Sequence, residues 1–190
     1  ASDVYKRQNV SNTGFYIRKF ISEASGYTLR NYAENWWPWF RLGEIYLNAA
    51  EAAFELNDEP TALPYINRLR QRAGFPANSL TSLTIEKIQN ERRVELAFED
   101  HRYFDMKRWR IADITWNGNI DNDKAIVYGL YPYRIAVAKP GTQDQDKYIF
   151  VKTRSERFKV ARTFQQSNYY SFIADDVINN NPTIVKNPFQ

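Results

Sequence analysis

The chain has 190 residues, of which 43% are hydrophobic and 25% are charged, and it contains no cysteine. This composition is typical of folded globular proteins. The lack of cysteine excludes disulfides, thiolate metal sites and cysteine nucleophiles. The net charge of +4 comes from 26 basic and 22 acidic residues interleaved along the chain, so no nucleic-acid partner is expected. No apolar run approaches the roughly 18 residues of a transmembrane helix.

Four regions of the chain differ in character. Residues 1–39 show no helical period and end in the aromatic run Trp36-Trp37-Pro38-Trp39. Residues 40–109 have a strong helical pattern. Residues 110 to about 162 are predicted to be loops, because turn formers such as Gly118, Pro132 and Pro140-Gly141 recur in them. In the tail that follows, the pairs Asn181-Pro182 and Asn187-Pro188 predict turns.

The pattern of residues 40–56 predicts the first helix, which has apolar side chains on nearly all of its faces. A helix of this kind is expected to be buried between neighbours. Residues 61–73 predict a second helix, which Gly74 would end in a left-handed conformation. The link between the two helices, residues 57–59, is so short that it favours an antiparallel hairpin. Such a pair resembles one tetratricopeptide-like unit.

A third helix is expected from the N-cap Thr84 to about Phe98. Arg92, Glu95 and Glu99 project between its apolar residues, and buried charge is costly unless it is paired. We therefore expect a structural ion-pair network, in which the acids of this helix find guanidinium partners. Its members are Arg41, Glu44, Glu51, Arg70, Arg72, Arg92, Glu95, Glu99, Arg102, Asp105 and Arg108.

The spacing of Glu91, Glu95 and Glu99 also raises the possibility of a carboxylate metal site. Dinuclear sites in helical bundles use Glu-x-x-His motifs. The single histidine, His101, has Phe98 three residues before it, so the pattern fails. No nucleotide-binding, nucleophile-elbow or zinc-protease motif occurs either. We therefore expect no catalytic residue, no metal and no cofactor.

Trp116 lies in a polar loop with Asn117, Gly118 and Asn119. An aromatic ring beside amides suits a sugar, because the ring stacks on the apolar sugar face and the amides bind hydroxyls. Trp116 and Asn117 are therefore the candidate ligand-binding residues. The alternative is that Trp116 is a local packing anchor.

Four segments in order resemble the SusD/RagB family. Residues 41–52 resemble R-x-A-E-x-Y-L-x-x-A-E-A, residues 66–74 resemble I-N-x-x-R-x-R-A-G, and residues 91–109 resemble E-R-R-x-E-L-A-F-E-G-x-R-x-F-D-L-x-R-W. Residues 181–189 resemble the terminal N-P-x-l-x-Q-N-P-G. The chain departs from these patterns with Asp100 and Phe189 in place of glycine, and with Lys186 in place of glutamine.

The resemblance implies a mainly α fold of tetratricopeptide-like helical hairpins, an α-α superhelix, with a loop-rich C-terminal region. It implies that residues 1–39 are an extended lead-in from a missing N-terminal part. Residues 40–109 would be the SusD/RagB helical core, and residues 110–190 would be the rest of the same C-terminal domain. The family blocks are scaffold, so none of them is carried over as a ligand site.

The resemblance further implies a non-catalytic glycan or nutrient-binding lipoprotein on the extracellular face of the outer membrane in Bacteroidota. Its partner would be a SusC-like TonB-dependent transporter, and its lipid anchor would lie in the missing N-terminal part. The alternative is a helical adaptor that binds a peptide or protein partner. A third interpretation, a glycan hydrolase, predicts that products are released on incubation.

Overall fold

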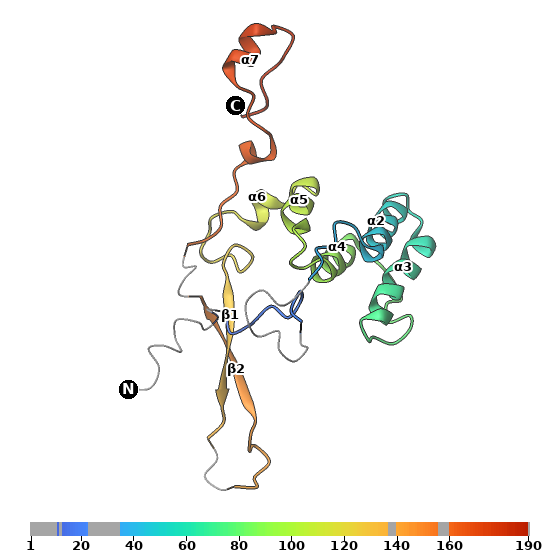
Figure 1. The fold of residues 1–190 in the computed structure, drawn as a ribbon, viewed down its shortest axis with the longest axis vertical. Coiled ribbons are helices and arrows are strands. Elements are labelled where there is room, and N and C mark those ends of the chain that lie inside the picture. The colour runs from blue at the N-terminus through green and yellow to red at the C-terminus, as the bar shows by residue number, and fades with distance from the viewer. Residues whose placement is uncertain (1–10, 12, 23–34, 137–139, 156–159, 190) are drawn as a thin grey trace. The chain divides into compact units, whose positions relative to one another are not determined.

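The structure is a computed structural model that describes residues 11, 13–22, 35–136, 140–155 and 160–189 (Figure 1). The chain divides into two compact units. We call Lys19–Asp105 the helical unit, and Ala1–Arg18 together with Met106–Gln190 the hairpin unit. Of the expected lead-in, residues 1–10, 12 and 23–34 lie outside the described residues. No helix in the described ranges is long and apolar enough to cross a membrane.

In the helical unit, α2 (Leu42–Glu55) and α3 (Glu59–Arg72) lie side by side (Figure 1). The helix α3 begins two residues earlier than expected, because the side chain of Asp58 accepts a hydrogen bond from the Thr61 N–H and caps it. Gly74 follows α3 with φ 95°, as its sequence position predicts. The expectation of a mainly helical fold with tetratricopeptide-like hairpins is confirmed.

The core of the helical unit joins α2, α3 and the next helix, α4 (Ile85–Glu95). The buried apolar side chains of this core are Leu47, Ala50, Ala62, Ile66, Leu69, Leu83, Ile88 and Leu96. The loop before α4 is tied to α3 by Asn67. Its side-chain amide donates to the Leu80 carbonyl at 2.9 Å and accepts from the Leu80 N–H at 3.0 Å.

The helix α4 begins after its cap Thr84 as expected, because the Thr84 hydroxyl accepts from the Lys87 N–H. It ends at Glu95, three residues before the predicted end. Phe98 and Asp100 have φ values of 65° and 61°, a left-handed conformation that no α-helix can contain. A separate helix, α5 (His101–Arg108), follows this turn.

The expectation that the first helix is buried on nearly all sides is wrong for the described part of the chain. Among these residues, α2 buries Gly43, Leu47, Ala50 and Glu51 against its neighbours. On another face, Leu42 and Ile45 are exposed, and Leu56 at its C-terminal end is 79% exposed. The apolar side chains of this helix that do not enter the core therefore form a solvent-exposed stripe, which we call the open stripe on α2.

The hairpin unit contains α6 (Ala112–Thr115) and two strands, β1 (Tyr128–Arg134) and β2 (Tyr148–Arg154). The strands form an antiparallel pair in a register from Tyr128 opposite Arg154 to Arg134 opposite Tyr148 (Figure 1). The sequence predicted loops here, because proline is rare in sheets and Pro132 was interpreted as a breaker. In the structure Pro132 lies inside β1. A two-stranded ribbon tolerates proline because both of its strands are edge strands. Pro132 lies opposite Phe150 in the register.

An early segment of the chain lies beside β1, since the Leu130 N–H donates to the Thr13 carbonyl at 3.0 Å. A Cβ on Gly129 would come within 2.8 Å of the Thr13 backbone. Glycine at position 129 therefore permits this close backbone approach.

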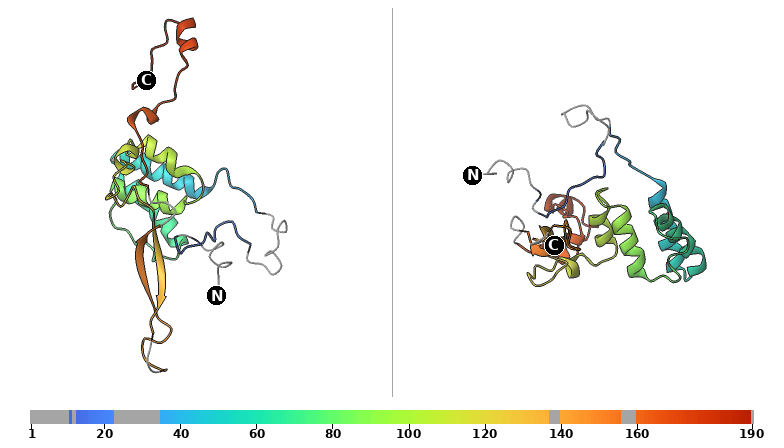
Figure 2. Two further views of the ribbon diagram at one scale, coloured as in Figure 1. Left: turned by 90° about the vertical axis from the view of Figure 1, so that its left-hand side faces the viewer. Right: turned by 90° about the horizontal axis from the view of Figure 1, so that it is seen from below.

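The C-terminal tail carries a short 3-10 helix, η1 (Gln166–Tyr169), and α7 (Asp175–Asn180), as Figure 2 shows. Two small buried clusters precede the tail. One contains Met106, Ala112 and Phe164, and the other contains Ala125, Ile126 and Ala161.

Candidate ligand-binding site

The charged residues predicted to form a structural network meet first around Arg41, at the start of α2. Its Nε donates to Glu99 Oε2 at 2.7 Å, and its Nη1 donates to Glu95 Oε1 at 2.5 Å. Its Nη2 binds the Glu95 main-chain carbonyl at 2.6 Å. Lys19 binds Glu99 and the Ala97 carbonyl. Arg41 thus joins α2 to the end of α4.

Two further arginines reach α4 from α3. Arg72 Nη2 donates to both carboxylate oxygens of Glu95, at 2.7 and 2.8 Å. Arg70 pairs with Glu91, and its Nε donates to Ser79 Oγ at 2.8 Å. We call Lys19, Arg41, Arg72, Glu95 and Glu99 the Arg41 cluster.

Arg92 forms a second charged group on the inner side of α4, where it is 5% exposed. Its Nε donates to Asp105 Oδ2 at 2.7 Å, and its Nη1 donates to Asn48 Oδ1 at 2.6 Å. Its Nη2 lies 4.0 Å from Glu44 Oε1. These contacts connect α2, α4 and α5.

The remaining predicted members lie on α2 and α5. Glu51 is buried on α2, and Arg102 is half-buried on α5. Arg108 places its guanidinium 5.0 Å from the ring centre of Trp109. Across the described ranges, no three His, Asp or Glu side chains are grouped so as to hold a metal ion.

The Arg41 cluster sets the protonation of its acids. Burial alone would raise the pKa of the Glu99 carboxyl, but hydrogen bonds from Arg41 and Lys19 outweigh it and leave the pKa below its usual value. Burial alone would also raise the pKa of Glu95, but the hydrogen bonds from Arg41 and Arg72 outweigh it, and the pKa of Glu95 is lowered. Both carboxylates therefore stay ionised near neutral pH, as an electrostatic tie between segments requires.

The predicted ligand residue Trp116 follows α6 in the hairpin unit. Its ring centre lies 6.4 Å from that of Phe164 and 5.5 Å from the guanidinium carbon of Arg162. The Phe164 N–H donates to the Trp116 carbonyl at 2.7 Å. Trp116 is half-buried, so part of its ring packs inside the loop and part remains accessible.

The structure places Asn117 within the turn that follows. Its Oδ1 accepts hydrogen bonds from the Asn119 N–H and from Asn122 Nδ2, both at 3.0 Å. Gly118 takes φ 76°, and its N–H donates to the Arg162 carbonyl. The side-chain oxygen of Asn117 thus shapes the loop that presents Trp116.

Aromatic rings continue from this loop toward the tail. Phe164 and Tyr169 lie 4.8 Å apart between ring centres. The Tyr169 hydroxyl donates to Asp113 Oδ1 at 2.6 Å and accepts from the Ala112 N–H at 2.9 Å. The Arg110 guanidinium lies 4.7 Å from the ring centre of Tyr169 and 5.2 Å from that of Tyr170. The tail is thereby fixed to α6.

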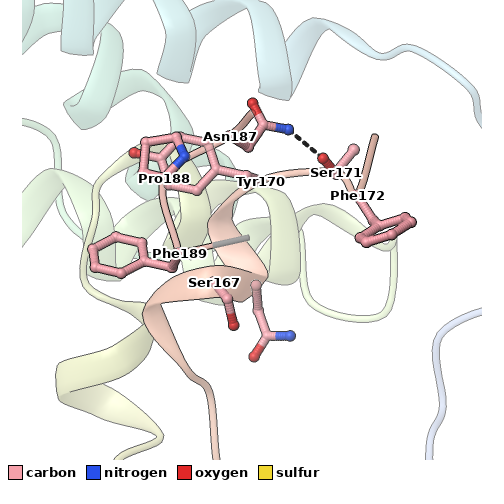
Figure 3. Close-up of a pocket in the computed structure, with 8 residues that line it drawn as sticks. Ser167, Tyr170, Ser171, Phe172, Asn187, Pro188 and Phe189 are labelled. Carbon is pink, nitrogen blue, oxygen red and sulfur yellow. Dashed lines mark hydrogen bonds between the residues drawn. The ribbon is translucent and has the colours of Figure 1, made fainter. Parts of the chain in front are cut away.

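Beyond Tyr170 the tail folds back and lines an open pocket of about 250 Å³, drawn in Figure 3. Its lining residues are Ser167, Asn168, Tyr170, Ser171, Phe172, Asn187, Pro188 and Phe189. Sequence reasoning missed this pocket, because the Asn-Pro pairs of the tail were interpreted only as turns. The adjacent Tyr169-Tyr170 and the late Phe189 are the aromatic signal that was available.

Comparison with known proteins identifies the family of the chain. The sequence model of the SusD family matches residues 2–189. SusD-like protein P25 of Formosa agariphila is 43% identical over 79 residues, which are 38% of this chain and 15% of the relative. SusD-like protein P2 of the same organism is 34% identical over 117 residues, which are 55% of this chain and 23% of the relative.

A crystal structure of a SusD-like protein from Bacteroides fragilis superposes with a TM-score of 0.61 at 29% sequence identity. The match covers 95% of this chain and 31% of that protein. The chain therefore spans less than a third of the length of these relatives. The family match over nearly every residue, together with this shared fold, shows that the chain belongs to the SusD family.

Proposed function

We propose that this chain is part of a nutrient-binding protein that holds a glycan at the outer face of a bacterial outer membrane. It passes the glycan to a SusC-like TonB-dependent transporter and makes or breaks no covalent bond. The observation that carries the proposal is the SusD family match over residues 2–189. A lipid anchor in a preceding N-terminal part would hold the protein at the membrane.

The proposed domain roles follow the same reasoning. Residues 40–109 form the helical core, and residues 110–190 complete the C-terminal domain and carry ligand-binding loops. Residues 1–39 lead in from the N-terminal part. The charged groups around Arg41 and Arg92 support a scaffold role for the core, since their carboxylates are bound by arginine side chains.

Ligand contact is proposed for the loop of Trp116 and Asn117. The Trp116 ring is half-buried and lies against Phe164 and Arg162, so neighbouring side chains limit its movement. A preorganised aromatic surface loses little entropy when a sugar stacks on it. The amide of Asn117 fixes the turn beside that ring and offers its Nδ2 hydrogens to a hydroxyl.

A calorimetric screen of polysaccharides and peptides against the protein tests the proposal. We expect heat of binding with at least one glycan and no released product after long incubation. Binding of peptides alone would instead favour the adaptor function, which the exposed apolar stripe of α2 supports. Product release would identify a hydrolase.

The Trp116→Ala variant tests the loop. We expect about tenfold weaker glycan binding, which corresponds to about 1.4 kcal/mol and lies within the range of aromatic contacts. Trp39→Ala removes an 80% exposed indole from the helical unit and is the matched control. Unchanged affinity of a folded Trp116→Ala protein would remove this loop from the ligand surface.

A further inference from the structure

The pocket in the C-terminal tail has a lining suited to one class of ligand. Its side chains are aromatic, amide, hydroxyl or proline groups, and none of them carries a formal charge. Figure 3 shows that Tyr170 and Ser171 come from the outgoing part of the tail, whereas Asn187 and Phe189 come from the part that folds back. Without a charged group, the pocket offers no compensation for burying an ionic ligand. An uncharged ligand with both apolar and hydroxyl surfaces fits it best.

The size of the pocket narrows the choice further. Its volume of about 250 Å³ lies below the roughly 300–1,000 Å³ of sites for drug-sized ligands. A single small ring is therefore the appropriate occupant. A sugar ring combines a flat C–H face, which stacks on aromatic rings, with hydroxyl groups around its edge.

Each of the two amides of the pocket makes one hydrogen bond within the tail. Asn187 Nδ2 donates to the Ser171 carbonyl, which leaves Oδ1 as an acceptor for a ligand hydroxyl. Asn168 Oδ1 accepts from the Gln165 N–H at 2.8 Å, which leaves the Nδ2 hydrogens as donors. A hydroxyl both donates and accepts, so sugar hydroxyls can bind either amide.

The backbone of Phe189 provides a reason to regard the pocket as a ligand site. Its φ of 66° lies in the left-handed region, where a bulky residue is strained and glycine is not. The chain thus places an aromatic ring at the pocket in spite of an unfavourable backbone conformation. Such strain is found where the side chain has a task at a ligand site.

We infer that the tail pocket is a subsite for one uncharged sugar ring, with Phe189 as its stacking surface and Asn168 and Asn187 as its hydroxyl contacts. The inference rests on the proposed function, because it assigns one ring of the bound glycan to a place in the chain.

Titration of the protein with uncharged monosaccharides, glucose, mannose, galactose and xylose, followed by NMR, tests the subsite directly. We expect the side-chain amide signals of Asn168 and Asn187 to shift with at least one of these sugars. Glucuronate, which carries a charge, should shift them much less. Calorimetry with the glycan selected by the screen gives the second readout.

The Phe189→Gly variant removes the ring and relieves the backbone, so it should fold at least as well as the parent chain. We expect affinity for the sugar to fall about five- to tenfold, while Phe189→Tyr keeps it within about twofold. Phe104→Ala is the matched control, because Phe104 is 67% exposed and Phe189 is 66% exposed.

The outcomes separate the two proposals. Monosaccharide shifts at both amides without any polysaccharide binding would support the subsite and contradict the proposed function. Polysaccharide binding that leaves both amides unshifted and is unaffected by Phe189→Gly would overturn the subsite alone. Binding of neither class of sugar would overturn both.

Discussion

Replacing Arg41 by methionine removes the guanidinium that joins the start of α2 to the end of α4, and it keeps most of the apolar stem. The Arg41 side chain is 25% exposed, Glu95 is 12% exposed and Glu99 is 3% exposed. Removing one partner of a buried ion pair costs about 3–5 kcal/mol. Arg72 and Lys19 still bind the two carboxylates, so we expect Arg41→Met to lower the free energy of unfolding by about 2–3 kcal/mol.

Urea unfolding followed by circular dichroism measures this loss. The control is Arg134→Met, because the Arg134–Asp146 pair is exposed on both sides and such pairs contribute about 0–1 kcal/mol. Adding Glu99→Gln to Arg41→Met should recover part of the stability, since it removes the buried carboxylate that lost one of its two cationic partners. Equal, small effects of Arg41→Met and Arg134→Met would refute the view that the Arg41 cluster holds the helical unit together.

Three further predictions concern stability. Because the pKa values of Glu95 and Glu99 are lowered from 4.5 in the folded chain, stability should be constant above this pH and fall as the pH drops below it. A urea midpoint that rises between pH 5 and pH 3 would contradict this. Asp100 has a φ of 61°, which glycine adopts without strain. Asp100→Gly should therefore raise the free energy of unfolding by about 0.5–1 kcal/mol, whereas Asp100→Ala should not raise it. Asn67→Ala should cost about 1–3 kcal/mol, because it leaves both main-chain groups of Leu80 without their partner; thermal melts compared with the parent chain check both substitutions.

Sequence reasoning succeeded where a single residue determines local structure. Thr84 and Gly74 act through their own side chain or backbone within one turn of the chain. The family resemblance, carried by four ordered segments, identified the fold. Charge placement among the apolar residues of the predicted third helix also indicated that Glu95 and Glu99 need cationic partners.

The choice of those partners could not be predicted, because it depends on how segments far apart in sequence meet. Lys19 was not among the candidates, although it binds Glu99 from 80 residues away. The end of α4 was missed because residues 96–100 contain no glycine or proline to signal the left-handed turn. The tail pocket was missed for a related reason, since Tyr170 and Phe189 meet only when the tail folds back.

The open stripe on α2 has a consequence for how the chain behaves in concentrated solution. Leu42, Ile45, Ala49, Ala52 and Leu56 follow one another at alternating steps of three and four residues, the spacing of a coiled-coil seam. Two apolar seams of this kind associate because their contact removes apolar surface from water. Sulfate should therefore promote reversible pairing of the purified 190-residue chain, and small amounts of urea should reverse it.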